Sequence, residues 1–334
     1  MKIKFMPVIF LLFSGAYTMI HAVEVNRVEE KKFQFSPGGT ISLFGNDGSI
    51  TITTWEKDEV YLKMTRRAWA RSKRDAEQML DALDVSIQRG IKRLVIREVK
   101  RNRHFNFFDL FDPDFWESRE WRNGLIDYEL KVPEEVNLKI RNDEGDVDIK
   151  GIKGRLNVKI DEGDLYLEQI ASESVEIDMD EGDISMNKLN GTGSTIVRIN
   201  VDEGRVLVED GSSGELDIKT DEGDMSVRRF KASRLWLSSD EGTISAEFDS
   251  DANGNYHFET DEGDIELWTN ENSSLRVRLV TDEGVIESDF DLEERKTDDG
   301  EIAYGEIGKG EALLRAYTDE GDIFLKIKEH FKSD

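Results

Sequence analysis

The tripeptide Asp-Glu-Gly occurs nine times in this chain of 334 residues. Its glycines are Gly145, Gly163, Gly182, Gly204, Gly223, Gly242, Gly263, Gly284 and Gly321. Between Gly145 and Gly284 seven intervals span 139 residues, so the mean spacing is close to twenty residues. An even spacing of this length indicates a repeat architecture, in which each unit is one small piece of supersecondary structure.

Apolar and polar residues alternate on both sides of each tripeptide. The positions one, three and five residues before the first aspartate are mostly apolar, as in Ile160, Val158 and Leu156. The positions two and four residues after the glycine are apolar as well, as in Leu165 and Leu167. A period of two is typical of β-strands with one buried face. Each unit is therefore predicted to be a strand, an acidic corner and a second strand.

A single unit cannot bury its apolar face, whereas stacked units bury it against one another. The sequence therefore predicts an all-β fold, a parallel β-solenoid (β-helix-like) of about 20-residue coils. Equivalent strands of successive coils would pair in parallel about 4.8 Å apart. At each corner the glycine would supply a positive φ, and an aspartate would close the turn through nearby backbone N–H groups.

Two degenerate tripeptides lie outside the regular series. Asn46-Asp47-Gly48 is predicted to be a first copy, and Asp298-Asp299-Gly300 is either a further copy or a loop. The segments that join one coil to the next vary in length, from KGIKGR to FDSDANGN. One corner of the coil is therefore constant and the opposite corner is variable.

Three stretches carry a resemblance to a known family: ISLFGNDGSITI, LKVPEEVNLKIRNDEGDVDI and the repeated TDEGDI. Together, over residues 30–328, they resemble the bacterial family of candidate adhesins built from β-strand repeats, a domain-of-unknown-function grouping. The resemblance implies an extracytoplasmic β-solenoid. This chain departs from the usual pattern in how uniformly acidic its corners are.

The N-terminus is predicted to be a secretory signal peptide, residues 1–22, because two lysines precede an apolar run and Ala22 precedes polar residues. Its removal takes away two of the 45 basic residues and changes the formal charge from −27 to −29. Such an acidic protein is not expected to bind nucleic acid. There are no cysteines, which excludes disulfides and cysteine metal ligands. The expected location is extracytoplasmic: periplasm, cell envelope or secreted.

The segment 23–130 is predicted to contain the first coil and a capping segment, before the repeats at 131–328 and a tail at 329–334. Ser72 is the expected N-cap of a short helix, with Ala76, Met79, Leu80 and Leu83 at helical spacing. Strands are expected at 85–87 and 94–99. Residues 63–103 also form a basic island, with 13 lysines and arginines against five acids.

Residues 104–122 hold a cluster of aromatic side chains among charges. They form either a loop folded over the end of the solenoid or an exposed contact for a partner or a membrane surface. The candidate contact residues are Phe107, Phe108, Phe111, Phe115, Trp116 and Trp121.

Stacked acidic corners would repel one another by about 1 kcal/mol per pair in bulk water, and more near a protein surface. Either the carboxylates splay into solvent, or cations such as Ca²⁺ bridge them. The corresponding cation ladder would consist of Asp143, Asp161, Asp180, Asp202, Asp221, Asp240, Asp261, Asp282 and Asp319. Neither an EF-hand loop nor the calcium-binding nonapeptide repeat is present. No other cofactor is expected.

An enzyme is the alternative class, because some glycan-acting enzymes are parallel β-helices with acid pairs on an outer face. Here the acids recur in every coil, whereas a catalytic pair should be a local departure. His104, His257 and His330 are scattered, and no catalytic residue is assigned.

Departures from the repeat mark further candidates for function. Arg205, Thr243 and Val285 replace the aspartate that usually follows the glycine. The outward-facing aromatic side chains are Tyr166, Trp236, Trp268 and Phe324.

The sequence therefore predicts a non-catalytic adhesin or envelope scaffold that presents an acidic repeat surface to a protein or glycan partner. A calcium-binding surface protein is a second alternative. Self-association is conceivable, through the basic island of one molecule and the acidic corners of another.

Overall fold

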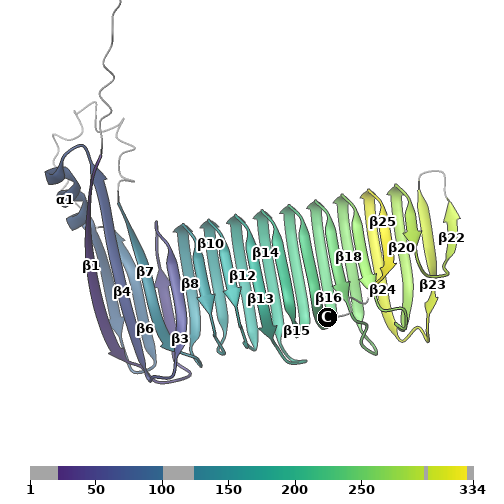
Figure 1. The fold of residues 1–334 in the computed structure, drawn as a ribbon, viewed down its shortest axis with the longest axis horizontal. Helices are drawn as coiled ribbons and strands as arrows, with labels where there is room; N and C mark the ends of the chain where they lie inside the picture. The colour runs from purple at the N-terminus through teal and green to yellow at the C-terminus, as the bar shows by residue number, and fades with distance from the viewer. Residues whose placement is uncertain (1–21, 101–123, 297–299, 329–334) are drawn as a thin grey trace, which may run out of the picture.

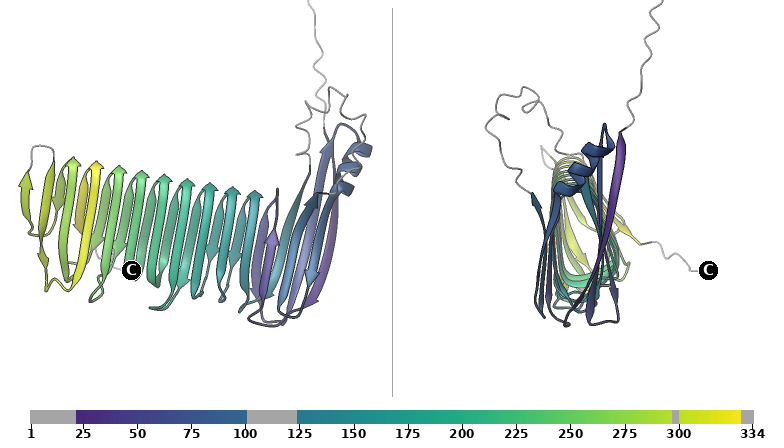
Figure 2. Two further views of the ribbon diagram at one scale, coloured as in Figure 1. Left: turned by 180° about the vertical axis from the view of Figure 1, so that it is seen from behind. Right: turned by 90° about the vertical axis from the view of Figure 1, so that its left-hand side faces the viewer.

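The computed structural model describes residues 22–100, 124–296 and 300–328. In these ranges the chain is all-β apart from one helix. The 25 strands belong to one mixed, nearly closed sheet that wraps around a single apolar core. Figure 1 shows the strands side by side along one long axis, and the end view in Figure 2 shows that they form two layers.

Each repeat contributes one strand to each layer. The strands that precede a corner, here called A strands, are β2 Thr40–Phe44, β8 Asn137–Glu144, β10 Leu156–Glu162, β12 Ser174–Glu181, β14 Ile196–Glu203, β18 Asn255–Glu262, β20 Leu275–Glu283 and β24 Ala312–Glu320. The strands that follow a corner, the B strands, are β3 Ile50–Trp55, β9 Val147–Lys150, β11 Leu165–Glu168, β13 Ile184–Asn190, β17 Ile244–Phe248, β19 Ile265–Thr269, β21 Ile286–Ser288 and β25 Ile323–Ile327. Two long strands, β15 Val206–Glu222 and β16 Met225–Glu241, begin in the B layer and continue into the A layer of the next repeat.

Neighbouring repeats pair in parallel with the corners in register. Val158 of β10 lies opposite Ile140 of β8 and Ile177 of β12. The alternating apolar side chains of both layers point inward, and they are buried in one continuous cluster. This confirms the predicted strand–corner–strand unit. The predicted first copy is confirmed too, because β2 and β3 pair in parallel with β8 and β9.

The order of repeats in space differs from their order in the chain. The last repeat, β24 and β25, lies between the repeat of β18 and β19 and the repeat of β20 and β21. The yellow C-terminal strands are accordingly seen inside the stack in Figure 1. The prediction that successive coils always stack on one another is wrong here. The physical reason is that all copies present the same pattern to their neighbours, so that pairing does not require chain order.

Antiparallel strands at both ends make the sheet mixed and not purely parallel. At the C-terminal end, β23 Glu301–Ile307 pairs antiparallel with β20 and with β22 Glu293–Lys296. The prediction for Asp298-Asp299-Gly300, a further copy or a loop, falls on residues 297–299, which lie outside the described ranges. The outermost strand, β22, is short and charged, which protects an open sheet edge from pairing with another chain.

At the N-terminal end, β1 Val23–Gln34, β4 Glu59–Ala70 and β7 Gly124–Pro133 pair antiparallel, as do β5 Leu83–Arg89 and β6 Arg93–Lys100. The helix α1 Lys73–Ala82 packs against β1 and β4. Its predicted N-cap is confirmed, because the Ser72 hydroxyl accepts a hydrogen bond from Asp75 N at 3.2 Å. Among the described residues, no helix has the length and apolar character needed to cross a lipid bilayer.

Candidate functional site

The corner glycines form a column along one edge of the sheet. The N–H of Gly204 donates a hydrogen bond to the carbonyl oxygen of Glu222 in the next repeat, at 3.0 Å, and equivalent bonds recur along the column. Gly204 has a φ of +148°. A Cβ atom at Gly204 would lie closer than 3.0 Å to the carbonyl oxygen of Gly182. Glycine is therefore required both by the backbone conformation and by the close approach of the preceding corner.

The aspartate after each glycine holds neighbouring corners together. Asp164 Oδ1 accepts a hydrogen bond from Asp183 N at 3.0 Å, and Asp183 Oδ1 accepts one from Arg205 N at 2.9 Å. The same bond is made by Asp146, Asp224, Asp264 and Asp322. The sequence predicts that an aspartate closes the turn but does not specify which one. The structure gives this role to the aspartate after the glycine, whose partner lies one repeat further along the stack.

Three repeats have another residue in place of this aspartate, and they make only one of its two hydrogen bonds. Arg205, Thr243 and Val285 each donate their backbone N–H to the aspartate of the preceding repeat. They offer no carboxylate to a following repeat, so the ladder of aspartates stops at each of them. It begins again at Asp224 after Arg205 and at Asp264 after Thr243, whereas Val285 lies in the last corner of the described stack. These substitutions therefore mark interruptions in a structural ladder.

Replacing Asp183 by alanine is expected to lower the free energy of unfolding by about 1 kcal/mol, because Arg205 N loses its acceptor at a solvent-exposed position. Asp202→Ala is the matched control. Its side chain has no hydrogen-bond or ion-pair partner among the described residues, so removing it should leave stability unchanged or slightly raised. Urea denaturation of both variants checks this, and equal losses would contradict the assignment.

The residue before the tripeptide supplies a buried polar group in several repeats. Thr318 Oγ1 donates to Gly263 O at 3.0 Å, and Thr281 Oγ1 donates to Gly321 O at 2.8 Å. In the corner of β8 the same position is Asn142, whose Nδ2 lies 3.0 Å from three carbonyl oxygens. These bonds satisfy carbonyl groups on the inner side of the corner, and they explain the threonine of the TDEG motif.

Two further columns of acidic side chains line the corners. They are the aspartate and the glutamate of each tripeptide, and we call them together the acidic edge. Some of them have partners: the Tyr317 hydroxyl, for example, donates to Asp319 and Asp282. The glutamates contribute a backbone carbonyl, which any residue could supply. At the corners of Gly204, Gly223 and Gly242 both acids are exposed, and neither has an ion-pair partner among the described residues. Nearer the N-terminal end, Arg141 lies 3.5 Å from Asp161, and Lys159 lies 3.4 Å from Asp180.

The predicted cation ladder occupies the first of these columns. The parallel register places its aspartates at equivalent positions of neighbouring repeats. In the part of the chain that the structure describes, no three histidine, cysteine, aspartate or glutamate side chains converge as they would around one metal ion. The ladder stays a prediction, and any cation would be shared between neighbouring repeats.

The other predicted contacts have different outcomes. The aromatic segment 104–122, with its six candidate residues, lies outside the described residues, as do His104 and His330. The basic island is partly neutralised within the molecule: Lys63 pairs with Glu129 at 2.6 Å, and Arg67 pairs with Asp127 at 2.8 Å.

The four outward-facing aromatic residues do not form one patch. Tyr166, Trp268 and Phe324 belong to the B strands β11, β19 and β25, whereas Trp236 belongs to the A-layer part of β16. The Trp236 ring lies 4.3 Å from the His257 ring, and His257 Nε2 lies 3.0 Å from Glu259 Oε2. His257 is therefore held between a ring and a carboxylate on the A face.

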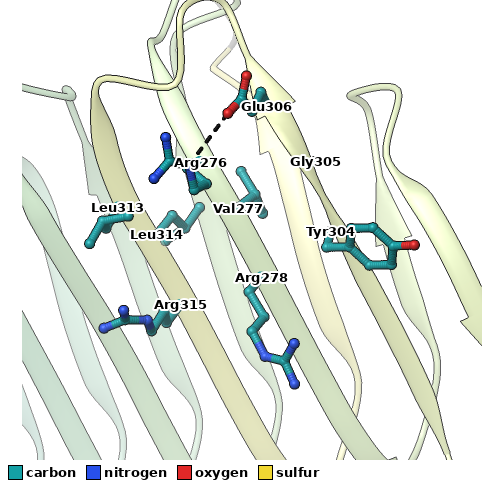
Figure 3. Close-up of a pocket in the computed structure, with 9 residues that line it drawn as sticks. All are labelled: Arg276, Val277, Arg278, Tyr304, Gly305, Glu306, Leu313, Leu314 and Arg315. Atoms are coloured by element: carbon teal, nitrogen blue, oxygen red, sulfur yellow. Dashed lines mark hydrogen bonds and ion pairs between the residues drawn. The ribbon is translucent and has the colours of Figure 1, made fainter.

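An arginine-rich pocket of about 420 Å³ lies on the same face towards its C-terminal end (Figure 3). It is open to solvent and is formed by β20, β23 and β24. Arg276, Arg278 and Arg315 surround it, and Tyr304 lies at its outer side. Arg276 Nε lies 3.4 Å from Glu306 Oε1. Among the described residues, Arg278 and Arg315 have no ion-pair or hydrogen-bond partner.

The pocket was not predicted from the sequence, although the sequence does show that some of the residues at and beside it share one outward row. Trp236, His257, Arg315 and Arg278 each lie four residues before a corner aspartate, so they occupy the same outward row. Two further facts come only from the structure: the insertion of β24 between β18 and β20, and the antiparallel strand that brings in Tyr304.

The chemistry of the pocket favours binding over glycosidic cleavage. Glycoside hydrolysis uses two carboxyl groups on either side of the scissile bond. Glu306 is the one carboxylate among the described residues that line this pocket, and it is paired with Arg276. Guanidinium groups without partners instead suit carboxylate or phosphate recognition.

A separate, half-buried carboxylate lies at the N-terminal end. Glu98 of β6 accepts hydrogen bonds from the Tyr128 hydroxyl at 3.1 Å and from the backbone N–H of Asn46. Burial raises the pKa of Glu98 to about 7; the two hydrogen bonds oppose this shift, while the charges of Asp47 and Asp143 add to it.

Comparison with known proteins places the chain in a family. Three solved structures are similar to it: candidate adhesins from Parabacteroides distasonis (9% identity, TM-score 0.47, 90% of this chain and 97% of the other), Parabacteroides merdae (9%, 0.44, 91% and 97%) and Bacteroides fragilis (11%, 0.37, 90% and 97%). No curated protein matches the chain. The Toastrack DUF4097 family profile matches residues 118–198 and 169–326, which together span more than half of the sequence. The chain belongs to the Toastrack DUF4097 family.

Proposed function

We propose that this chain is a non-catalytic, extracytoplasmic binding protein of the bacterial envelope, in which a parallel β-solenoid presents its acidic edge to a cationic partner. It would act as an adhesin or as an envelope scaffold. The family assignment, the predicted signal peptide and the repeat architecture support this proposal.

The acidic edge is the observation that carries the proposal. The corner glycine and the aspartate after it have structural roles, whereas at the corners of Gly204, Gly223 and Gly242 the two acids of the tripeptide have no side-chain hydrogen-bond or ion-pair partner among the described residues. Acidic side chains one strand spacing apart repel by about 1 kcal/mol or more per pair. A fold that keeps this repulsion at the three successive corners of Gly204, Gly223 and Gly242 would recover it on binding a cationic partner, which is why the edge is assigned to binding.

The test compares the wild-type protein, residues 23–334, with two variants in which six acids become amides. The edge variant changes Asp202, Glu203, Asp221, Glu222, Asp240 and Glu241. The control variant changes Glu24, Glu56, Asp58, Glu173, Glu294 and Glu311, which are exposed acids away from the corners. Both variants gain the same charge, so a purely global electrostatic effect would be equal in the two.

Binding of a fluorescent octalysine peptide is then measured by anisotropy at low and physiological salt. We expect the edge variant to bind at least tenfold more weakly, a loss of about 1.4 kcal/mol or more, and the control variant to change much less. Equal weakening in both variants would overturn the edge as the binding surface.

Thermal unfolding in EDTA, Ca²⁺, Mg²⁺ and matched NaCl distinguishes the calcium alternative. A rise of the midpoint with Ca²⁺ alone, lost in the edge variant, would identify the partner as a divalent ion bridging the repeats. Equal stabilisation by all salts would indicate simple screening.

A further inference from the structure

The A face carries a continuous row of five side chains from neighbouring strands. Trp236 lies opposite His257, His257 opposite Arg315, Arg315 opposite Arg278, and Arg278 opposite Tyr304. The two arginines are therefore flanked by aromatic rings on both sides. We propose that this row, with the pocket beneath its arginines, binds an acidic oligosaccharide whose sugars carry carboxylates. This is a second site, with a charge opposite to that of the acidic edge.

The two central arginines point to an anionic ligand. Arg278 and Arg315 are exposed and directly opposite each other on adjacent parallel strands. Like charges in this arrangement destabilise a sheet, and neither side chain has a partner among the described residues that would offset the repulsion. A guanidinium group binds a carboxylate through two parallel hydrogen bonds. Two such groups one strand apart can therefore hold two carboxylates, or one from both sides.

The flanking rings favour a sugar chain over a compact anion. Trp236 is 38% exposed and Tyr304 is 44% exposed, so both rings are accessible to a ligand. From Trp236 to Tyr304 the row crosses four strand spacings, or about 19 Å. A single phosphate or carboxylate would occupy only the middle of this length. An extended ligand would place apolar sugar faces on the rings and carboxylates on the arginines.

The net negative charge of the protein does not prevent anion binding at this row. Arg278 lies four residues before Asp282 of the acidic edge, a separation of about 13 Å along an extended strand. The Debye length at physiological salt is about 8 Å, so most of the field of the edge is screened at the row. Close to the row, Glu306 pairs with Arg276, and Glu259 lies against His257. Two further acids lie beyond the ends of the row, away from the arginines: Asp217 is opposite Trp236, and Glu293 is opposite Tyr304 and accepts a hydrogen bond from its hydroxyl.

The experiment measures binding of tetragalacturonic acid to the protein, residues 23–334, by titration calorimetry at physiological salt. The double variant Arg278→Gln with Arg315→Gln is expected to bind at least tenfold more weakly than wild type. The matched control is Arg89→Gln with Arg155→Gln, two exposed arginines outside the row, and it should bind as wild type does. Trp236→Ala is expected to weaken binding of the tetramer several-fold without affecting binding of galacturonic acid monomer.

Three further probes can overturn the proposal. Neutral maltotetraose should not bind; if it binds as well as the uronate tetramer, the arginines do not select the ligand. A tetra-aspartate peptide that binds as tightly as the uronate tetramer, with Trp236→Ala without effect, would assign the row to an acidic protein segment. Inorganic phosphate that displaces the tetramer at equal concentration would leave only a simple anion site.

This proposal and the proposed function fail independently. The acidic edge is tested with a cationic peptide and the row with an anionic sugar, on variants that share no residue. Each variant set can also be titrated with the other probe. The arginine variant should keep octalysine binding, and the edge variant should keep tetragalacturonate binding.

Discussion

Replacing Gly204 by alanine is expected to destabilise the protein by about 3–5 kcal/mol, among the largest effects of a single substitution. The glycine has a φ of +148°, a conformation that costs other residues about 1–3 kcal/mol. The added methyl group would also meet the carbonyl oxygen of Gly182 at less than 3.0 Å. Relief would require separating two repeats, which lengthens the corner hydrogen bonds on both sides.

Gly193→Ala is the matched control, because no atom lies within 4 Å of a Cβ at that position. Urea denaturation followed by circular dichroism should show a large drop of the midpoint for the Gly204 variant and almost none for the Gly193 variant. In a stack of repeats, stability depends on contacts between nearest neighbours. Amide exchange should therefore accelerate first in the strands beside Gly204. Equal midpoints for the two variants would contradict the stacked-corner account.

The repeat unit could be predicted from sequence because its signals are local. The alternation around Gly163 indicates two strands, and the even spacing of the tripeptides indicates stacking. Ser72 and the apolar spacing that follows it located the helix. Each of these inferences needs only residues close together in the chain, where side-chain period and capping chemistry decide the structure.

The order of the repeats could not be predicted, because it depends on a choice between equivalent partners. The strands β18, β20 and β24 all end in the sequence Thr-Asp-Glu. Any two of them can pair in the same register, so local pattern gives no preference. The insertion of β24 is consistent with the hairpin of β22 and β23 covering β20 on its other side. The arginine row depends on this order and was missed for the same reason.

The roles of the acidic residues at the corners could be predicted only in part from the sequence. The sequence shows two aspartates around six of the nine glycines but does not say which one accepts a backbone N–H. The structure separates them, because the acceptor partner lies in the next repeat, about twenty residues away, as for Asp164 and Asp183. The acids of the acidic edge do not take part in this ladder of hydrogen bonds.

The second large effect is a pH dependence of the free energy of unfolding that arises from the half-buried Glu98. Its pKa is raised from 4.5 to about 7 in the folded protein. The folded state therefore binds this proton more tightly than the unfolded state, so the stabilisation from protonated Glu98 is fully present below pH 4.5. It is lost as the pH rises from 4.5 to 7, and the total loss is about 3 kcal/mol.

Glu98→Gln keeps the shape of the protonated side chain and cannot ionise. Relative to wild type, the variant should gain about 3 kcal/mol of stability between pH 4.5 and pH 8, measured as the difference of two urea denaturation series. Glu24→Gln, an exposed substitution on β1, should run parallel to wild type over the same range. A difference between wild type and Glu98→Gln that stays constant from pH 4.5 to pH 8 would show that ionisation of Glu98 does not oppose folding. The charges of Asp47 and Asp143 add to the shift, so neutralising Asp143 should reduce it and bring the first acidic corner into the same equilibrium.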